Sequence, residues 1–271
     1  MYARNTLLAY QGDMLRFARY IQENISPSAR LADFTAPNLQ AFLQSEIDAG
    51  YHPHTIARRL VSLKAFNFFL DRPVTSWESI SALAAHNRDQ RRGQNLLPSL
   101  QQPHLSAVWS LLEQAPQARA RRDQALLALL LETGLPVQRL LAINLADLSE
   151  DCHKLILTQP AGTGTSITLE WAGQPLRRYI KEGRPELIRQ PEEPALWLSQ
   201  SGRRMTRQAV WQALHKWGHR ASLPYPLSPR LLSNTAAQRL ILSGLPLKQI
   251  QVRLGHQSSL STLARVRRIV D

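Results

Sequence analysis

The strongest constraint on the fold is the apolar run ALLALLL at residues 125–131, near the middle of the chain. Residues 123–133 are predicted to be helical, and a helix that is apolar on every side has to be buried. We therefore predict a core helix here, with the rest of a domain packed around it. At 271 residues the chain is long enough to bury two cores of ordinary size.

Four helices are predicted in the first 85 residues. Apolar residues recur at helical spacing over residues 4–24, from Pro37 to Gly50, and behind Pro53, and a shorter helix is expected at 77–84. The third helix carries one apolar stripe, made of Ile56, Leu60, Leu63, Phe66, Phe69 and Leu70. Its opposite face is expected to carry Thr55, Arg58, Arg59, Ser62 and Lys64.

A polar and basic stretch at residues 86–101 is typical of an interdomain linker. It divides the chain into a helical domain at 1–85 and a second domain at 102–271. The second domain is predicted to have helices at 105–112, 206–219, 230–243 and 246–254, in addition to the core helix. Two alternating segments, 154–158 and 166–171, predict strands joined by the turn-rich residues 160–164. The expected fold class is mainly α, in two domains, with one small antiparallel sheet.

Positive charge is concentrated at the C-terminal end. The formal net charge is +13, and residues 194–270 contain no Asp or Glu. The same stretch holds twelve cations: Arg203, Arg204, Arg207, Lys216, Arg220, Arg230, Arg239, Lys248, Arg253, Arg265, Arg267 and Arg268. Such a surface favours a polyanionic partner, with nucleic acid ahead of a face kept basic for solubility and of an anionic membrane.

Several other classes of protein are disfavoured. No stretch approaches the ~20 apolar residues that span a bilayer, and we see no secretory signal. The single cysteine, Cys152, excludes an internal disulfide framework and a multi-cysteine zinc site. We expect a cytoplasmic, nucleoid-associated protein with no membrane partner, no metal and no cofactor.

Five segments, in order, resemble the tyrosine recombinases of the phage-integrase family. Residues 5–17 match N-T-x-x-x-Y-x-x-D-x-x-x-F, and residues 55–70 match T-I-x-R-R-L-x-x-L-x-x-F-x-x-F-L. Arg122-Asp123 followed by ALLALLLETGL, then LWLSQSGRRMTRQAVWQAL, then SGLPLKQIQVRLGHQS match three further family segments. The resemblance, Xer-like and spanning some 250 residues, implies a SAM-like helical domain and a mixed α/β catalytic-type domain that close on DNA as a C-shaped clamp.

The family's chemistry uses a tyrosine nucleophile, two arginines that clamp the phosphate, a lysine acid and histidines. In this sequence the first arginine position is Pro136, the hairpin lysine position is Ala161 and the second arginine position is Ser233. The two histidines of H-x-L-R-H are Arg230 and Asn234; His256 is retained, and no tyrosine follows Tyr225. On this basis we predict no catalytic residue, and a degenerate recombinase that is not an enzyme.

DNA-contacting residues are carried over from the resemblance. The family places the polar side of the third helix, and the start of the helix after Thr206, in the grooves of the duplex. The predicted DNA-binding residues are Thr55, Arg58, Arg59, Ser62, Lys64, Arg203, Arg204, Thr206, Arg207, Gln208, Lys216, Arg220, Arg230 and His256. Trp211 and Trp217 are expected to pack inward.

Three functional interpretations remain open. The first is a site-specific double-stranded DNA-binding protein without cleavage activity: a target-site selector for transposition, an accessory factor or a repressor. The second is an active tyrosine recombinase whose catalytic residues are relocated or supplied by a partner subunit. The third is a protein scaffold that no longer needs DNA. Expected partners are duplex DNA and recombinase or transposition proteins, with the chain a monomer or a dimer on DNA.

Overall fold

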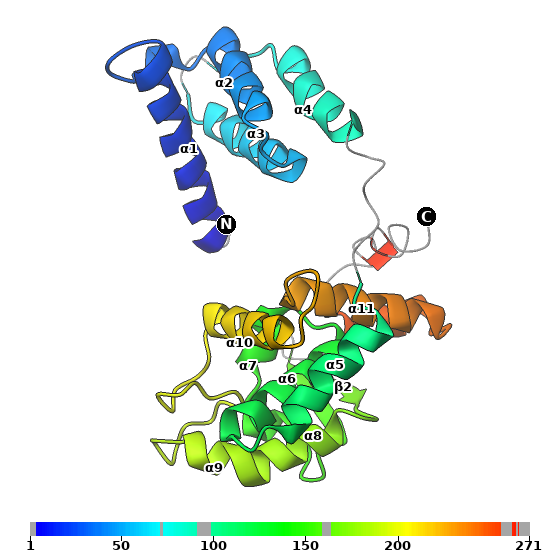
Figure 1. Cartoon of the computed structure of the whole chain (residues 1–271). Helices are drawn as coiled ribbons and strands as arrows, with labels where there is room; N and C mark the ends of the chain where they lie inside the picture. Colours follow the sequence, from blue (N-terminus) through cyan, green and yellow to red (C-terminus); the bar gives the residue numbers. More distant parts are fainter. Residues whose placement is uncertain are drawn as a thin grey trace. The chain divides into compact units, whose positions relative to one another are not determined.

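The computed structural model describes residues 4–70, 73–90, 99–158, 164–255, 262–263 and 265. The chain forms two compact units, an N-terminal unit at Met1–Asn95 and a C-terminal unit at Leu96–Asp271. Each unit has its own hydrophobic core and is described by itself (Figure 1).

The N-terminal unit is built from four helices (blue to cyan in Figure 1). They are α1 (Arg4–Asn24), α2 (Ala36–Asp48), α3 (Pro53–Asn67) and α4 (Glu78–Gln90), with a 3-10 turn η1 (Leu31–Asp33) before α2. The Thr35 hydroxyl accepts a hydrogen bond from the Asn38 amide and so caps the start of α2. The core of the unit is formed by Phe17, Ile21, Phe34, Leu39, Phe42, Leu43, Ile56, Leu63, Ile80 and Ala84.

Both ends of the α3–α4 connection differ from the sequence prediction. Helix α3 ends at Asn67, so Phe69, expected on the apolar stripe, is 78% exposed. The Asn67 side chain explains the stop, because it donates to the Val74 carbonyl and accepts from the Val74 amide. Helix α4 continues to Gln90, so residues 86–90 are helical and not linker as predicted.

The C-terminal unit is organised around α6 (Ala118–Thr133), as the apolar run predicts. Every residue from Arg122 to Thr133 is buried. Around α6 pack α5 (Gln102–Gln114), α8 (Gly173–Arg178), a π-helical turn η4 (Tyr179–Gly183), α9 (Arg184–Leu187), α10 (Arg207–Arg220) and α11 (Pro229–Leu242). Two further helices, α7 (Val137–Ala142) and α12 (Leu247–Arg253), and a 3-10 turn η3 (Leu145–Asp147) complete the unit.

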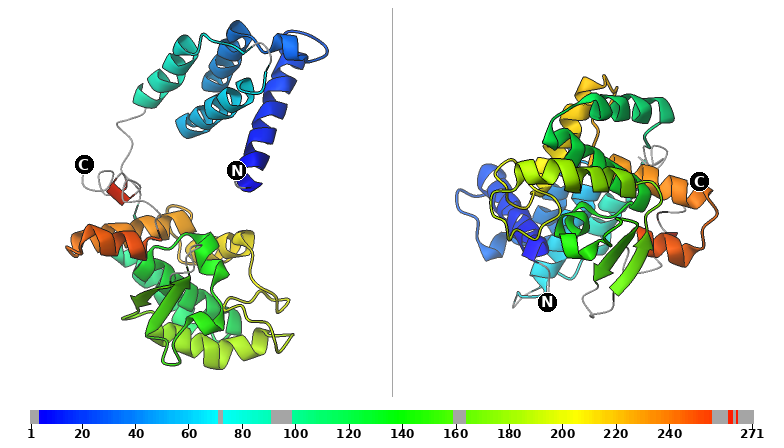
Figure 2. Two further views of the ribbon diagram at one scale, coloured as in Figure 1. Left: turned by 180° about the vertical axis from the view of Figure 1, so that it is seen from behind. Right: turned by 90° about the horizontal axis from the view of Figure 1, so that it is seen from below.

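The sheet is a single antiparallel pair of β1 (Lys154–Thr158) and β2 (Gly164–Thr168), in a register that pairs Lys154 with Thr168. Both views in Figure 2 show this hairpin at the margin of the helices. The second strand ends at Thr168, three residues earlier than predicted. The Glu132 carboxylate explains this end. It accepts hydrogen bonds from the backbone amides of Glu170 at 2.5 Å and Ala172 at 2.8 Å, so these amides are not available to extend the strand pairing.

The predicted fold class, mainly α with one small antiparallel sheet, is confirmed. Helix α7 and the succession α8–η4–α9 were not predicted from the sequence. These elements are four to six residues long, too short to show a hydrophobic period.

Candidate functional site

The polar side of α3 is only partly exposed to solvent. Thr55 is partly exposed, Arg58 is exposed, and the exposed Lys64 donates to the Ser81 hydroxyl at 2.9 Å. Arg59 and Ser62, expected on the same open face, are buried, with Arg59 8% exposed. The prediction that all five residues line an accessible face is therefore wrong for Arg59 and Ser62.

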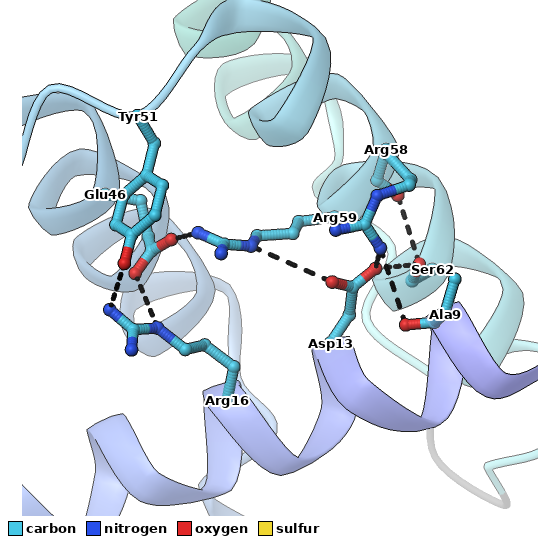
Figure 3. A network of polar contacts seen from close by, with 8 residues as sticks. All are labelled: Ala9, Asp13, Arg16, Glu46, Tyr51, Arg58, Arg59 and Ser62. Carbon is cyan, nitrogen blue, oxygen red and sulfur yellow. Dashed lines mark hydrogen bonds and ion pairs between the residues drawn. The ribbon is translucent and has the colours of Figure 1, made fainter. Parts of the chain in front are cut away.

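A buried ionic network accounts for that difference (Figure 3). The Arg59 guanidinium lies between Glu46 of α2, with which it is ion-paired, and Asp13 of α1, at 3.7 Å. The Ser62 hydroxyl donates to Asp13 at 2.6 Å. Burial lowers the pKa of Arg59, and the neighbouring Asp13 charge opposes that shift.

The outer edge of the network is more exposed. Arg16 donates to Glu46 at 3.1 Å and to the Tyr51 hydroxyl at 3.0 Å, and Arg58 is ion-paired with Asp13. Together these contacts join α1, α2 and α3, so their first consequence is to position α3 and the side chains that it exposes.

Helix α10 carries the second group of predicted DNA-binding residues. Thr206 caps the helix, because its hydroxyl accepts a hydrogen bond from the Ala209 amide at 3.1 Å. Seven of the residues predicted around this helix and at the start of α11 are exposed: Arg203, Thr206, Arg207, Gln208, Lys216, Arg220 and Arg230.

Arg204 and Trp211 lie differently from what the sequence predicts. Arg204 is half-buried and donates to the Leu141 carbonyl at 2.6 Å and to the Asn144 side chain at 2.5 Å, so it fastens the loop before α10 to the end of α7. Trp217 is buried as expected, but Trp211 is 47% exposed and stacks on His215 at 4.8 Å.

The positions matching the family's two arginines lie close together in the C-terminal unit. Gly134 ends α6 in the left-handed conformation, at φ +69°. The Ser233 hydroxyl of α11 donates to the Gly134 carbonyl at 2.8 Å, and Pro136 follows at the start of α7. Ala161 and His256, two further positions of the family's catalytic pattern, lie outside the described residues.

An arginine that the motif comparison did not select lies at the same place. Arg265 donates to the Ser233 hydroxyl at 3.0 Å and to the Asn234 side-chain oxygen at 2.8 Å. It comes from the segment after His256, in which the family pattern led us to search only for a tyrosine. A search for any phosphate-binding side chain in that segment would have found it.

A second arginine packs beside this group. Gly255 has φ +64°, and a Cβ built on it would lie 3.3 Å from both Arg139 Cδ and Pro136 Cδ. Arg139 and Arg265 are both half-buried. Positive charge is thus retained around Ser233, although Ser233 itself and Pro136 are uncharged.

Other kinds of site find little support in the described part of the chain. No group of three or more His, Cys, Asp or Glu side chains there could hold a metal ion. None of the helices described is long and apolar enough to cross a membrane.

Comparison with known proteins gives a match over almost the whole chain. The phage integrase family model matches residues 103–266, and the model of the phage integrase N-terminal SAM-like domain matches residues 1–72. Tyrosine recombinase XerD of Pseudomonas putida is 31% identical, over 95% of this chain and 84% of its own length. Tyrosine recombinase XerC of Herpetosiphon aurantiacus is 28% identical, over 95% of this chain and 83% of its own.

A solved structure supports the fold. The XerH site-specific recombinase bound to its palindromic difH substrate superposes with a TM-score of 0.75 at 17% identity, over 96% of this chain and 76% of that one.

These comparisons contradict the prediction of a non-cleaving DNA-binding protein that is not an enzyme. The relatives are named as tyrosine recombinases, and none of them points to a target-site selector without cleavage activity. That prediction weighed the family's catalytic positions, one at a time, against a similarity that extends through both units. The chain belongs to the phage integrase family, with Xer tyrosine recombinases among its relatives.

Proposed function

We propose that this protein acts in DNA recombination as a tyrosine recombinase whose catalytic groups are relocated within the chain or supplied by a partner subunit. The observation that carries the proposal is the similarity to proteins named tyrosine recombinases across 95% of the chain. The substrate is double-stranded DNA, in keeping with the net charge of +13 and with the DNA-bound state of the XerH structure.

The reaction transfers a phosphodiester bond. A tyrosine oxygen forms a bond to the scissile phosphorus while the bond from phosphorus to the 5′ oxygen breaks. The phenol loses its proton, the departing 5′ oxygen gains one, and the reverse attack by a 5′ hydroxyl rejoins the strand. The bond energy is kept in the phosphotyrosyl link, so the reaction needs no nucleotide cofactor.

Tyr225 is the candidate for a nucleophile within this chain. Its hydroxyl lies 2.7 Å from His104 Nδ1, the separation expected of a nucleophile paired with a base. It is half-buried and precedes α11, the helix that carries Arg230 and Ser233. The other source is a tyrosine of a partner recombinase subunit bound at the adjacent half-site.

Exposure and internal contacts together divide the predicted DNA-binding residues into two roles. We propose that direct contacts come from Thr55, Arg58, Lys64, Arg203, Arg207, Gln208, Lys216, Arg220 and Arg230, which are exposed or partly exposed. Four others hold these surfaces in place through internal hydrogen bonds and ion pairs: Arg59 and Ser62, which are buried, Arg204, which is half-buried, and Thr206, which is exposed but caps α10. His256 stays a predicted DNA contact. A role in DNA recombination implies a cytoplasmic, nucleoid-associated protein that binds DNA as a monomer or a dimer.

The test begins by selecting a bound half-site from random duplex DNA. That half-site is then built into a nicked suicide substrate, on which a cleaved strand cannot be rejoined and the protein stays attached. The purified chain is incubated with the substrate alone, and then with an active Xer recombinase whose own half-site is adjacent. A covalent protein–DNA adduct is read on a denaturing gel.

Three variants identify the nucleophile. Loss of the adduct in Tyr225→Phe, but not in Tyr20→Phe, would assign it to this chain. An adduct at this half-site that needs both proteins, and that disappears when the partner's nucleophile is changed to Phe, would assign it to the partner. Absence of any adduct at this half-site, both alone and in the mixture, would overturn the proposal.

A further inference from the structure

The Arg265 guanidinium is fixed beside α11 by short polar side chains. Its Nη2 atom donates to Ser233 Oγ at 3.0 Å and to Asn234 Oδ1 at 2.8 Å. Ser233 in turn donates to the carbonyl oxygen of Gly134, at the end of α6. Ser233 and Asn234 are neutral, so these two contacts orient the guanidinium and do not themselves neutralise its charge.

Ser233 and Asn234, which stand where the family pattern has an arginine and a histidine, fit that arrangement. Serine and asparagine are short and offer oxygen acceptors, whereas an arginine at position 233 would place a second positive charge against Arg265. The guanidinium therefore reaches the position next to Ser233 from a segment 32 residues further along the chain.

Two further cations flank this position. Arg139 packs over Gly255, with its Cδ atom 3.3 Å from a Cβ built there. Arg230 is exposed on the first turn of α11, three residues before Ser233 and so on the same side of the helix. Planar guanidinium groups suit the oxygens of a phosphodiester, to which they donate paired hydrogen bonds.

We propose that Arg265 is the main phosphate-binding arginine of this chain, replacing the arginine that position 233 lacks, with Arg139 beside it. The ligand is one phosphodiester of the DNA backbone. This inference rests on the proposed function for its consequence in cleavage, but phosphate binding can be measured without any cleavage.

The experiment compares four full-length proteins on the selected half-site: wild type, Arg265→Ala, the double variant Ser233→Arg/Arg265→Ala, and Arg177→Ala. The last removes an exposed cation of α8 in the same unit and controls for the loss of one charge. The first readout is DNA affinity as a function of salt concentration. The second is the rate of adduct formation at saturating DNA, with whichever nucleophile source the suicide substrate reveals.

Arg265→Ala is expected to lower the slope of log affinity against log salt by about one. It should also slow adduct formation by about 100-fold or more, the usual effect of removing one donor to a developing oxyanion. The double variant should recover part of both losses, because it returns a guanidinium to the same place from α11. Arg177→Ala should leave the rate of adduct formation unchanged.

The results separate this inference from the proposed function. If wild type forms the adduct and Arg265→Ala forms it at the same rate with the same salt slope, the inference is wrong and the recombinase activity stands. If no protein forms an adduct, the proposed function fails, and the salt slope alone decides whether Arg265 binds phosphate. A thermal midpoint that falls in Arg265→Ala, with no recovery of slope or rate in the double variant, would show a structural role and overturn the inference.

Discussion

At the scale of single residues, Arg59 is held where a charge is costly. It is buried between two carboxylates, and it lies over the Tyr51 ring at 4.4 Å. Removing one member of such a buried ionic group destabilises the fold, because each partner that remains becomes a buried and uncompensated charge.

Arg59→Ala is therefore expected to lower the free energy of unfolding by about 3–5 kcal/mol, because Glu46 and Asp13 lose their shared cation. The neighbouring Arg58→Ala should cost about 0–1 kcal/mol, since Arg58 is largely exposed to solvent and to salt screening. Urea titration of the full chain measures both. Equal losses in the two variants would contradict the role assigned to the network.

Tyr179 provides a pH-dependent test of burial. It is fully buried, and its hydroxyl donates to the Leu196 carbonyl at 3.0 Å. Burial raises the pKa of Tyr179 to about 12. Because the folded pKa lies above the unfolded value of about 10, the unfolded chain releases this proton first, and stability falls as pH rises from about 10 to 12.

Tyr179→Phe should remove this part of the alkaline loss, although it also removes a buried hydrogen bond. The measurement is the midpoint of urea unfolding at pH 9, 10 and 11 for both proteins. The midpoint of the variant should fall less steeply with pH than that of wild type. Parallel curves would show that Tyr179 ionises normally.

At the scale of elements, the turn from α6 to α7 depends on a glycine. Gly134 has φ +69°, and a Cβ there would lie 2.5 Å from Leu254 Cδ2 and 3.2 Å from Ala236 Cβ. Gly134→Ala combines a left-handed backbone with overpacking, and we expect a loss of about 2–4 kcal/mol in stability.

Gly12→Ala is the matched control for that substitution. Gly12 lies in α1, where a Cβ meets nothing within 4 Å, so alanine should stabilise the helix by about 0.5–1 kcal/mol. Thermal unfolding of the two variants should shift the midpoint in opposite directions. A neutral Gly134→Ala would contradict the close packing of α6, α11 and α12 at this turn.

The different exposure of two arginines at the start of α10 can be tested by the salt dependence of DNA affinity. Arg207 is exposed in its first turn, whereas Arg204 is bound internally to the end of α7. Arg207→Ala should reduce DNA affinity and lower the salt slope by about one, with unchanged thermal stability. Arg204→Ala should lower thermal stability instead, and the opposite assignment of the two effects would refute this division.

At the scale of the whole molecule, the two units have separate hydrophobic cores. Leu43 lies in the core of the N-terminal unit and Leu129 in that of the C-terminal unit, and both are fully buried. Each change to alanine leaves a cavity and costs about 2–5 kcal/mol in its own core.

Calorimetry of the full chain is therefore expected to show two unfolding transitions. Leu43→Ala should lower the midpoint of one transition and Leu129→Ala the midpoint of the other. If each variant shifted both midpoints together, the two units would unfold as a single cooperative body.

The sequence by itself determined which residues share a face and where most helices begin. The apolar run predicted the buried α6, and five ordered segments predicted the family. Pro37 and Thr206 predicted the starts of two helices, and the first turns of α2 and α10 confirm them. These features depend on local spacing and on side-chain bonds to neighbouring backbone, both of which can be followed along the chain.

Only the tertiary structure decided which faces meet. Helical period places Arg58, Arg59 and Ser62 on the polar side of α3, but packing against α1 and α2 buries Arg59 and Ser62. In the C-terminal unit, Trp211 of α10 is exposed although its position in the sequence predicts that it packs inward. Likewise Arg265 lies beside Ser233 although 32 residues separate them. Contacts between residues so far apart in the sequence depend on how the helices pack, and a local pattern of residues does not predict them.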